Sequence, residues 1–241
     1  EQVFSGRSRV LGPDHRSTLT ARDDLAATYW EAGRLDEAIT LKEQILADAL
    51  RIMGPDSPGA STARLNLAAT YRDARRLDES INLYKENLDD VARIMGPHHP
   101  DTFTARNRLA VAYRDAGRLD EAIPLFEQNL DDVARLAGPD HPHTLSSRGT
   151  LASAYRDAGR LDEAIPLFEQ NLDDVARTLG LDHPETLASR HSLAGAYRDA
   201  GRLDDAIPLF EQNLTDFTRI LGPDRPDTFT SRSTLASAYQ A

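Results

Sequence analysis

The sequence repeats itself with a period of 42 residues, and no insertion interrupts that period. The stretch 112–135 recurs letter for letter at 154–177. A strict period places each unit against the next in the same geometry, which is typical of a solenoid. Three residue types mark the six copies: Tyr29, Tyr71, Tyr113, Tyr155, Tyr197 and Tyr239; Gly12, Gly54, Gly96, Gly138, Gly180 and Gly222; Leu25, Leu67, Leu109, Leu151, Leu193 and Leu235.

Each unit is predicted to form two helices. In the third copy, Phe103, Leu109 and Tyr113 lie close to one stripe of a helix over residues 102–116. A second helix is expected to open at Asp120, an N-cap residue type, and its apolar residues recur at three- and four-residue steps. A Gly-Pro dipeptide then turns the chain into the next unit.

This pattern resembles the tetratricopeptide repeat. The residues that carry the resemblance are Leu109, Ala110 and Tyr113 in the first helix, and Ala122 and Phe126 in the second. The 42-residue unit is longer than the usual one of 34 residues. It is similar to the repeats of kinesin light chains, and more similar to arrays on bacterial, notably actinobacterial, NB-ARC or STAND-type signalling ATPases. The resemblance implies an all-α fold, a right-handed α-solenoid of antiparallel helix pairs.

The period also predicts the domain organisation. We expect a single solenoid over residues 1–241. Residues 1–13 are interpreted as the remnant of a preceding second helix, and 224–241 as the unpaired first helix of a sixth repeat. The five complete repeats are expected at 14–55, 56–97, 98–139, 140–181 and 182–223.

Two sets of positions depart from the family pattern. An arginine replaces a large first-helix residue, and an asparagine replaces a small alanine of the second helix. A buried asparagine without a partner loses roughly 1–3 kcal/mol. We therefore hypothesise that the asparagines are partly buried and bond to a neighbouring helix; alternatively, both sets face solvent at the helix edge. The two sets are Arg22, Arg64, Arg106, Arg148, Arg190 and Arg232, and Asn87, Asn129, Asn171 and Asn213.

Nothing in the sequence indicates catalysis. The chain has no cysteine and no phosphate-binding GxxxxGK[ST] motif, and its carboxylates recur at equivalent positions, so repeats give them equivalent environments. His98, His99, His141 and His143 lie in the inter-repeat turns and are interpreted as helix caps, not as metal ligands. We expect no enzyme activity, no cofactor and no metal.

The net charge of −11 argues against nucleic acid as a partner, because phosphates require a basic face. No apolar run approaches the roughly 20 residues that cross a bilayer, so no membrane partner is expected either. We expect a cytoplasmic location.

The copies differ most along one strip of the first helix. In tetratricopeptide arrays, first helices line the concave groove, so the resemblance implies that this strip faces a bound segment. Neutral drift of an exposed surface is the alternative explanation. The expected ligand-binding residues are Asp23, Ala27, Trp30, Leu65, Asn66, Arg72, Asn107, Arg108, Val111, Arg114, Gly149, Thr150, Ser153, Arg156, His191, Ser192, Gly195 and Arg198.

Four of these, Arg72, Arg114, Arg156 and Arg198, follow the repeated tyrosine and are able to form a ladder that binds carboxylates. The alternative is that each arginine pairs with an aspartate of an adjoining unit. Trp30 occupies the equivalent position in the first unit, either as an exposed contact anchor or as a cover for the N-terminal helix.

These observations favour a non-catalytic scaffold that binds a protein or peptide segment in its concave groove, as a fragment of a larger bacterial regulatory protein. A sensor or autoinhibitory arm of a STAND-type ATPase is a second hypothesis. A third is a structural solenoid that self-assembles, because neither end of the sequence carries a polar cap and head-to-tail association is expected of uncapped ends.

Overall fold

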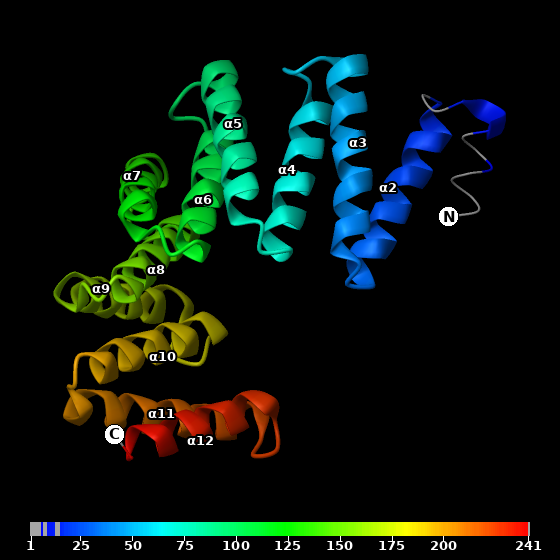
Figure 1. Cartoon of the computed structure of the whole chain (residues 1–241). Coiled ribbons are helices and arrows are strands. Elements are labelled where there is room, and N and C mark those ends of the chain that lie inside the picture. Colours follow the sequence, from blue (N-terminus) through cyan, green and yellow to red (C-terminus); the bar gives the residue numbers. More distant parts are fainter. Residues whose placement is uncertain (1–5, 7–8, 13–14, 241) are drawn as a thin grey trace. The chain divides into compact units, whose positions relative to one another are not determined.

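The computed structural model describes residues 6, 9–12 and 15–240, which form helices and turns without a strand. The predicted all-α class is confirmed, and helices that follow one another within a unit, such as α3 and α4, run in opposite directions (Figure 1). The helices are α2 (Arg16–Glu31), α3 (Leu35–Met53), α4 (Pro58–Asp73), α5 (Leu77–Met95), α6 (Pro100–Asp115), α7 (Leu119–Ala137), α8 (Pro142–Asp157), α9 (Leu161–Leu179), α10 (Pro184–Asp199), α11 (Leu203–Leu221) and α12 (Pro226–Ala238).

The chain divides into two compact units, Glu1–Ala122 and Ile123–Ala241. In the first unit, α2 packs on α3, α3 on α4, α4 on α5, and α5 on α6. In the second unit, α8, α9, α10, α11 and α12 pack in the same consecutive manner. Within each unit the helices therefore stack as neighbours in sequence, which is the packing of an α-solenoid.

The helix bounds can be placed against the expected repeats. Each of the five ranges expected for complete repeats holds one first helix and one second helix, and α12 lies in 224–241. The expected N-terminal remnant, 1–13, falls largely outside the described residues.

A first helix begins at a proline that follows a capping residue, as in α6, α8 and α10. His99 Nδ1 accepts a hydrogen bond from the backbone N–H of Asp101 at 3.2 Å, and His141 does the same for His143. The capping interpretation is therefore confirmed for His99 and His141. Helix α6 begins at Pro100, two residues before the expected start.

The cap of the second helix differs from the prediction. Helix α7 starts at Leu119, so the assignment of Asp120 as its N-cap is wrong. The backbone N–H of Ala122 donates to the carbonyl oxygen of Arg118 at 3.1 Å, which makes Arg118 the cap position. Asp120 lies inside the first turn, where its charge stabilises the positive end of the helix dipole.

The turn between the two helices of a repeat needs a left-handed residue. Gly117 and Gly159 adopt φ angles of 72° and 71° there. Arg75 occupies the same position in the second repeat, with a φ of 59°. A residue with a Cβ is strained in this conformation, so this turn is less favourable than its glycine counterparts.

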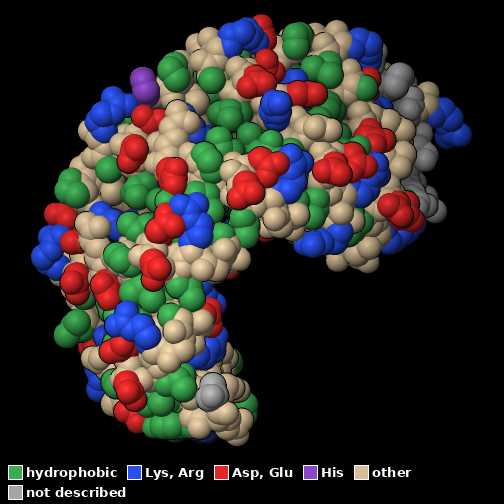
Figure 2. All heavy atoms as spheres, turned by 60° about the vertical axis from the view of Figure 1, so that its left-hand side comes forward, with side chains coloured by type: hydrophobic (Ala, Val, Ile, Leu, Met, Phe, Trp, Pro, Cys, Tyr) green, Lys and Arg blue, Asp and Glu red, His purple; other side chains and the backbone are tan. Residues whose placement is uncertain are grey.

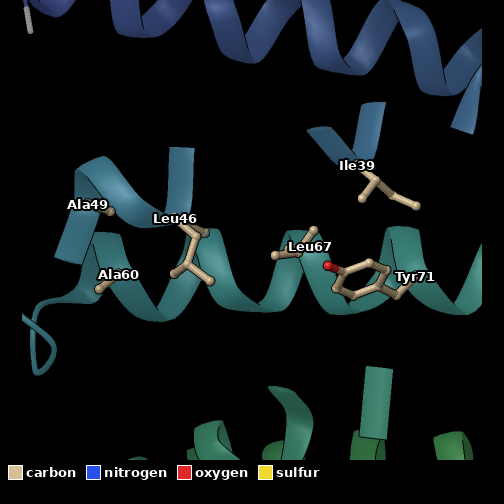
Figure 3. Packing of buried hydrophobic residues seen from close by; sticks show 7 residues of the cluster. Ile39, Leu46, Ala49, Ala60, Leu67 and Tyr71 are labelled. Carbon is tan, nitrogen blue, oxygen red and sulfur yellow. The ribbon is translucent and has the colours of Figure 1, made fainter. Parts of the chain in front are cut away.

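The core lies between consecutive helices. In the first unit, Ile39 and Leu46 of α3 point toward Leu67 and Tyr71 of α4, with small alanines filling the closest approach (Figure 3). In the second unit, Phe168 and Phe210 are among the largest fully buried side chains. Apolar residues recur at most of the equivalent positions, so the repeats share a common packing.

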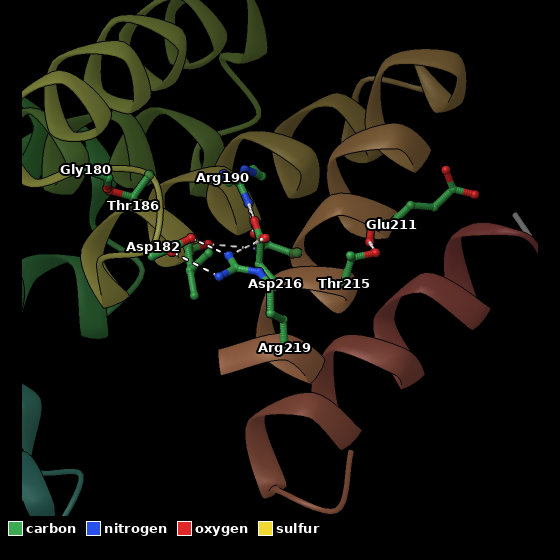
Figure 4. A network of polar contacts seen from close by, with 10 residues as sticks. Gly180, Asp182, Thr186, Arg190, Glu211, Thr215, Asp216 and Arg219 are labelled. Carbon is green, nitrogen blue, oxygen red and sulfur yellow. Dashed lines mark hydrogen bonds and ion pairs between the residues drawn. The ribbon is translucent and has the colours of Figure 1, made fainter. Parts of the chain in front are cut away.

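A buried polar layer accompanies this core. Arg64 of α4 donates from Nη1 to Asp90 Oδ2 of α5 at 2.8 Å, and Arg148 makes the same contact with Asp174 at 2.7 Å. Figure 4 shows the equivalent pair of Arg190 with Asp216. The alternative in which the arginines of complete repeats face solvent is therefore wrong, although Arg232 of α12 is exposed.

The asparagines are buried as hypothesised, and several bond to the neighbouring first helix. Asn213 Nδ2 donates to the carbonyl oxygen of Leu187 at 2.9 Å, and its Oδ1 accepts from Arg190 at 3.0 Å. Asn87 Nδ2 donates to Ser61 Oγ at 2.8 Å. These bonds satisfy side chains that would otherwise lose hydration on burial.

Candidate protein-binding surface

The predicted ligand-binding residues all lie on first helices, and they differ in accessibility. Five are exposed: Asp23, Ala27, Trp30, Asn66 and Arg108. Twelve are half-buried: Leu65, Arg72, Asn107, Val111, Arg114, Gly149, Thr150, Ser153, Arg156, His191, Ser192 and Arg198. Gly195 is buried, so it offers no direct surface to a ligand.

The burial of Gly195 has a local cause. A Cβ atom built on this residue would lie 3.2 Å from Arg156 Nη1. The guanidinium of Arg156 therefore lies over the backbone of α10, at a place where a larger residue would press against it. Gly195 contributes by allowing this close approach.

Two arginines of the ladder pair with aspartates of the following repeat. Arg156 Nε donates to Asp199 Oδ2 at 2.7 Å, and Arg72 Nε lies 3.8 Å from Asp115 Oδ2. Arg198 pairs with the neighbouring Asp199 at 3.1 Å. Pairing with an aspartate of the adjoining repeat is therefore confirmed for Arg72 and Arg156, whereas Arg198 pairs within its own repeat.

Basic side chains also lie beside acidic ones elsewhere on the surface. Figure 2 shows one face of the molecule on which Lys and Arg side chains are interspersed with Asp and Glu side chains. Pairing of this kind leaves little free positive charge, so recognition of an acidic group has to rely on individual cationic side chains that lack a partner.

Trp30 takes the place of an arginine in this ladder. Its indole Nε1 donates to Asp73 Oδ2 of the next repeat at 2.7 Å, while 45% of the residue stays exposed. The tryptophan thus keeps the contact between repeats and presents an aromatic surface to solvent.

His191 is a perturbed titratable group among the predicted residues. Its ring packs edge-on against Phe210, with the centroids 5.5 Å apart. Burial lowers the pKa of His191, and the nearby charges of Arg156 and Arg198 lower it further. The imidazole is therefore neutral at pH 7, and it offers one hydrogen-bond donor and one acceptor.

Sequence reasoning missed Lys42. This lysine occupies the position of the aromatic residues Tyr84, Phe126, Phe168 and Phe210. Its Nζ donates to Thr70 Oγ1 at 2.6 Å, and burial lowers the pKa of its ammonium group. Alignment of the copies could have revealed Lys42, because a lysine at a position that is aromatic in the other copies needs polar neighbours for its ammonium group.

Sequence reasoning also missed a cleft in the first unit. It has a volume of about 360 Å³ and lies between α4, α5 and α6. Leu65, Val91 and Ile94 form part of its apolar wall, and Ser61 and Asn87 are among its polar residues. The signal was again a difference between copies, because Ser61 is the small member of a set of leucines and phenylalanines.

The described part of the chain has neither a cluster of metal-ligating side chains nor a helix suited to spanning a membrane. Among those residues, no three His, Cys, Asp or Glu side chains are grouped so that they could hold a metal ion. No helix within the described ranges has both the length and the hydropathy needed to span a membrane.

Comparison with solved structures identifies kinesin light chain-like relatives. Nearly identical TPR-like repeats of a kinesin light chain-like protein from Podosopora anserina share 32% identity, cover 85% of this chain and 97% of that chain, and superpose with a TM-score of 0.75. A singly substituted form of the same repeats gives 31% identity, 83% and 95% coverage, and a TM-score of 0.75.

BtubC (BKLC) from P. vanneervenii is similar in fold only, with 18% identity, 92% coverage of each chain and a TM-score of 0.71. No curated protein matches this chain.

The tetratricopeptide repeat family model matches residues 1–51, 32–88, 59–131, 101–173, 149–215 and 187–241, which together span the chain. The chain therefore belongs to the tetratricopeptide repeat family, and it resembles the kinesin light chain-like members of that family.

Proposed function

We propose that this chain is a non-catalytic scaffold that binds a segment of another protein along its first helices. Family membership supports a protein-binding role. The observation that carries the proposal is that buried and accessible positions differ in how much they vary among the repeats. Residues that join helices, such as Arg148 and Tyr155, recur in the copies and are buried, whereas accessible first-helix residues, such as Asn66 and Val111, change from copy to copy.

The contacts between repeats give this surface a rigid base. Tyr71 of α4 donates from its hydroxyl to Glu43 Oε1 of α3 at 2.5 Å, and Arg76 lies over its ring with Cζ 4.5 Å from the centroid. Tyr155 and Tyr197 make equivalent contacts with Glu127 and Glu169. A base held by such repeated bonds lets the variable side chains keep fixed positions, which reduces the entropy lost on binding.

A peptide-display selection against the 241-residue chain tests this function. We expect selected peptides to lose at least about tenfold in affinity, or ~1.4 kcal/mol, when Asn66→Arg and Val111→Arg are combined on α4 and α6. Asp89→Arg on the exposed face of α5 is the matched control and should leave affinity unchanged. If no peptide is selected, or if the control weakens binding as much as the double variant, the proposal fails.

Self-association is a second candidate function, favoured by the surface of α12. Phe229 and Tyr239 on and beside this helix are 68% and 59% exposed. Analytical ultracentrifugation over a range of concentrations should show association that Phe229→Ser weakens. A strict monomer at high concentration would exclude this function.

The regulatory arm of a bacterial STAND-type ATPase in the cytoplasm is a third candidate, implied by sequence resemblance alone. The full-length gene tests it directly, because a nucleotide-binding domain encoded beside these repeats is required.

A further inference from the structure

The cleft in the first unit arises from one substitution among the copies. Ser61 occupies the position held in the other copies by Leu19, Phe103, Leu145, Leu187 and Phe229. Leu145 and Leu187 are each 2% exposed and Phe103 is 7% exposed, so this position is normally filled by a buried apolar side chain. Serine is too small to fill it, and the space remains open between α4, α5 and α6.

Neighbouring residues preserve the start of α4 around this space. In the third repeat, Thr102 Oγ1 donates to the carbonyl oxygen of Gly96 at 2.7 Å. The second repeat has Ala60 at that position, and Ser57 Oγ instead donates to the carbonyl oxygen of Gly54 at 2.8 Å. Ser57 Oγ also accepts from the backbone N–H of Ala60 at 3.1 Å, so α4 keeps its N-cap beside the cleft.

The walls of the cleft are suited to an apolar group with a polar edge. Leu65, Val91 and Ile94 supply apolar surface, and Ile94 is 49% exposed although it is a large hydrophobic residue. Asn87 already donates to Ser61 Oγ, so the polar floor is satisfied without a ligand. A volume of about 360 Å³ is at the lower end of the range of small ligand pockets, and it accommodates a single large side chain.

Charge at the mouth favours one orientation of the occupant. Arg64 is paired with Asp90 at 2.8 Å, and Arg93 with Asp56 at 2.5 Å. Arg108 also lines the cleft, is exposed, and forms no ion pair with any of the described residues. Arg108 is therefore the cation available to an occupant, and it complements a carboxylate. Asp101, an exposed acidic residue about two turns earlier on α6, also lines the cleft and repels a carboxylate at that end.

We propose that this cleft receives a leucine- or phenylalanine-sized side chain from the bound protein segment, with a carboxylate of that segment against Arg108. The side chain of the partner replaces the one that the other copies supply from within the chain. This inference rests on the proposed scaffold function and deepens it, because it names the anchor position and the chemistry of the anchor.

Small probes test the cleft independently of any peptide partner. The neutral probe is N-acetyl-L-phenylalaninamide, and the charged probe is N-acetyl-L-phenylalanine. Both should cause saturable shifts of the methyl signals of Leu65, Val91 and Ile94 in NMR spectra of the whole chain. The charged probe should bind about two- to fivefold more tightly, the range expected of an exposed ion pair.

Three variants test the cavity and the charge of Arg108 separately. Ser61→Leu fills the cleft with the residue of other copies, so it should fold normally and abolish binding of both probes. Arg108→Gln should remove only the advantage of the charged probe. Ser146→Leu makes the same substitution at an exposed position of α8 and should bind as the wild type does.

The outcomes also distinguish this inference from the proposed function. Shifts that do not saturate, or equal binding to wild type and Ser61→Leu, would overturn the cleft as a site. If a display-selected peptide binds the wild type and Ser61→Leu with equal affinity, the cleft inference is overturned, whereas the proposed scaffold function still holds. A selection that yields no peptide overturns the scaffold function, while the probe measurement still decides the cleft.

Discussion

Trp30 of the first repeat donates a hydrogen bond from its indole nitrogen to Asp73 of the second at 2.7 Å, where Arg156 donates to Asp199 at the same distance. Two chemically different side chains thus make the same contact between repeats. The contact requires a donor of sufficient reach, and it does not require a positive charge.

The Trp30 contact can be measured with a double-mutant cycle. We expect Trp30→Ala and Asp73→Ala to show a coupling free energy of about 0.5–1.5 kcal/mol in urea unfolding, the usual contribution of one hydrogen bond. Trp30→Arg should retain most of this coupling, because arginine makes the contact elsewhere. If Trp30→Arg loses as much coupling as Trp30→Ala, the equivalence of the two side chains is wrong.

The buried ion pair of Arg148 and Asp174 should dominate the polar contribution to stability within a repeat. Arg148→Ala leaves the carboxylate of Asp174 without its partner in a largely buried place, so we expect a loss of about 3–5 kcal/mol in the free energy of unfolding. Arg232→Ala is the matched control, because Arg232 has the same position in α12 but is exposed. It should change stability by no more than about 0.5 kcal/mol.

The turn that contains Arg75 should contribute least to stability among the turns between the two helices of a repeat. Replacement by glycine removes the strain of its left-handed backbone, and we expect Arg75→Gly to raise the free energy of unfolding by up to about 1 kcal/mol. The reverse change, Gly159→Arg, should lower it by a similar amount. A thermal melt that shows Arg75→Gly to be less stable than the wild type would contradict the assignment of strain.

The contacts between repeats should weaken at alkaline pH. Burial and the hydrogen bond to a glutamate raise the pKa of Tyr71, Tyr155 and Tyr197 to about 12. A folded pKa above the unfolded value means that the protonated phenol stabilises the fold. This contribution is complete below about pH 10 and is lost as pH rises from about 10 to about 12.

Urea unfolding at several pH values checks this behaviour. The free energy of unfolding should fall steeply above about pH 10 in the wild type, and Tyr71→Phe should reduce the slope, because phenylalanine has no proton to lose. An identical slope in the two proteins would rule out a contribution from the phenol of Tyr71.

Much of this fold could be predicted from the sequence, because the residues that determine the helices and turns are close in sequence and recur in every repeat. The period of apolar residues and the glycine and proline turns determine that helices form in pairs, and the histidine caps follow from their place before the helix start. The exact cap of the second helix could not be predicted, since Asp120 is a good N-cap residue that the chain uses inside the first turn of the helix. The alternative starts of a helix differ by little in free energy, so packing selects between them.

The tertiary structure decided what each side chain does. Whether Arg64 is buried or exposed depends on Asp90, 26 residues away, and whether Arg156 is free depends on Asp199, 43 residues away. The accessible part of the predicted surface, the burial of Gly195 and the cleft beside Ser61 likewise depend on how neighbouring helices approach. A repeat determines its own helices through contacts within a few turns, but burial and charge pairing are properties of two helices together.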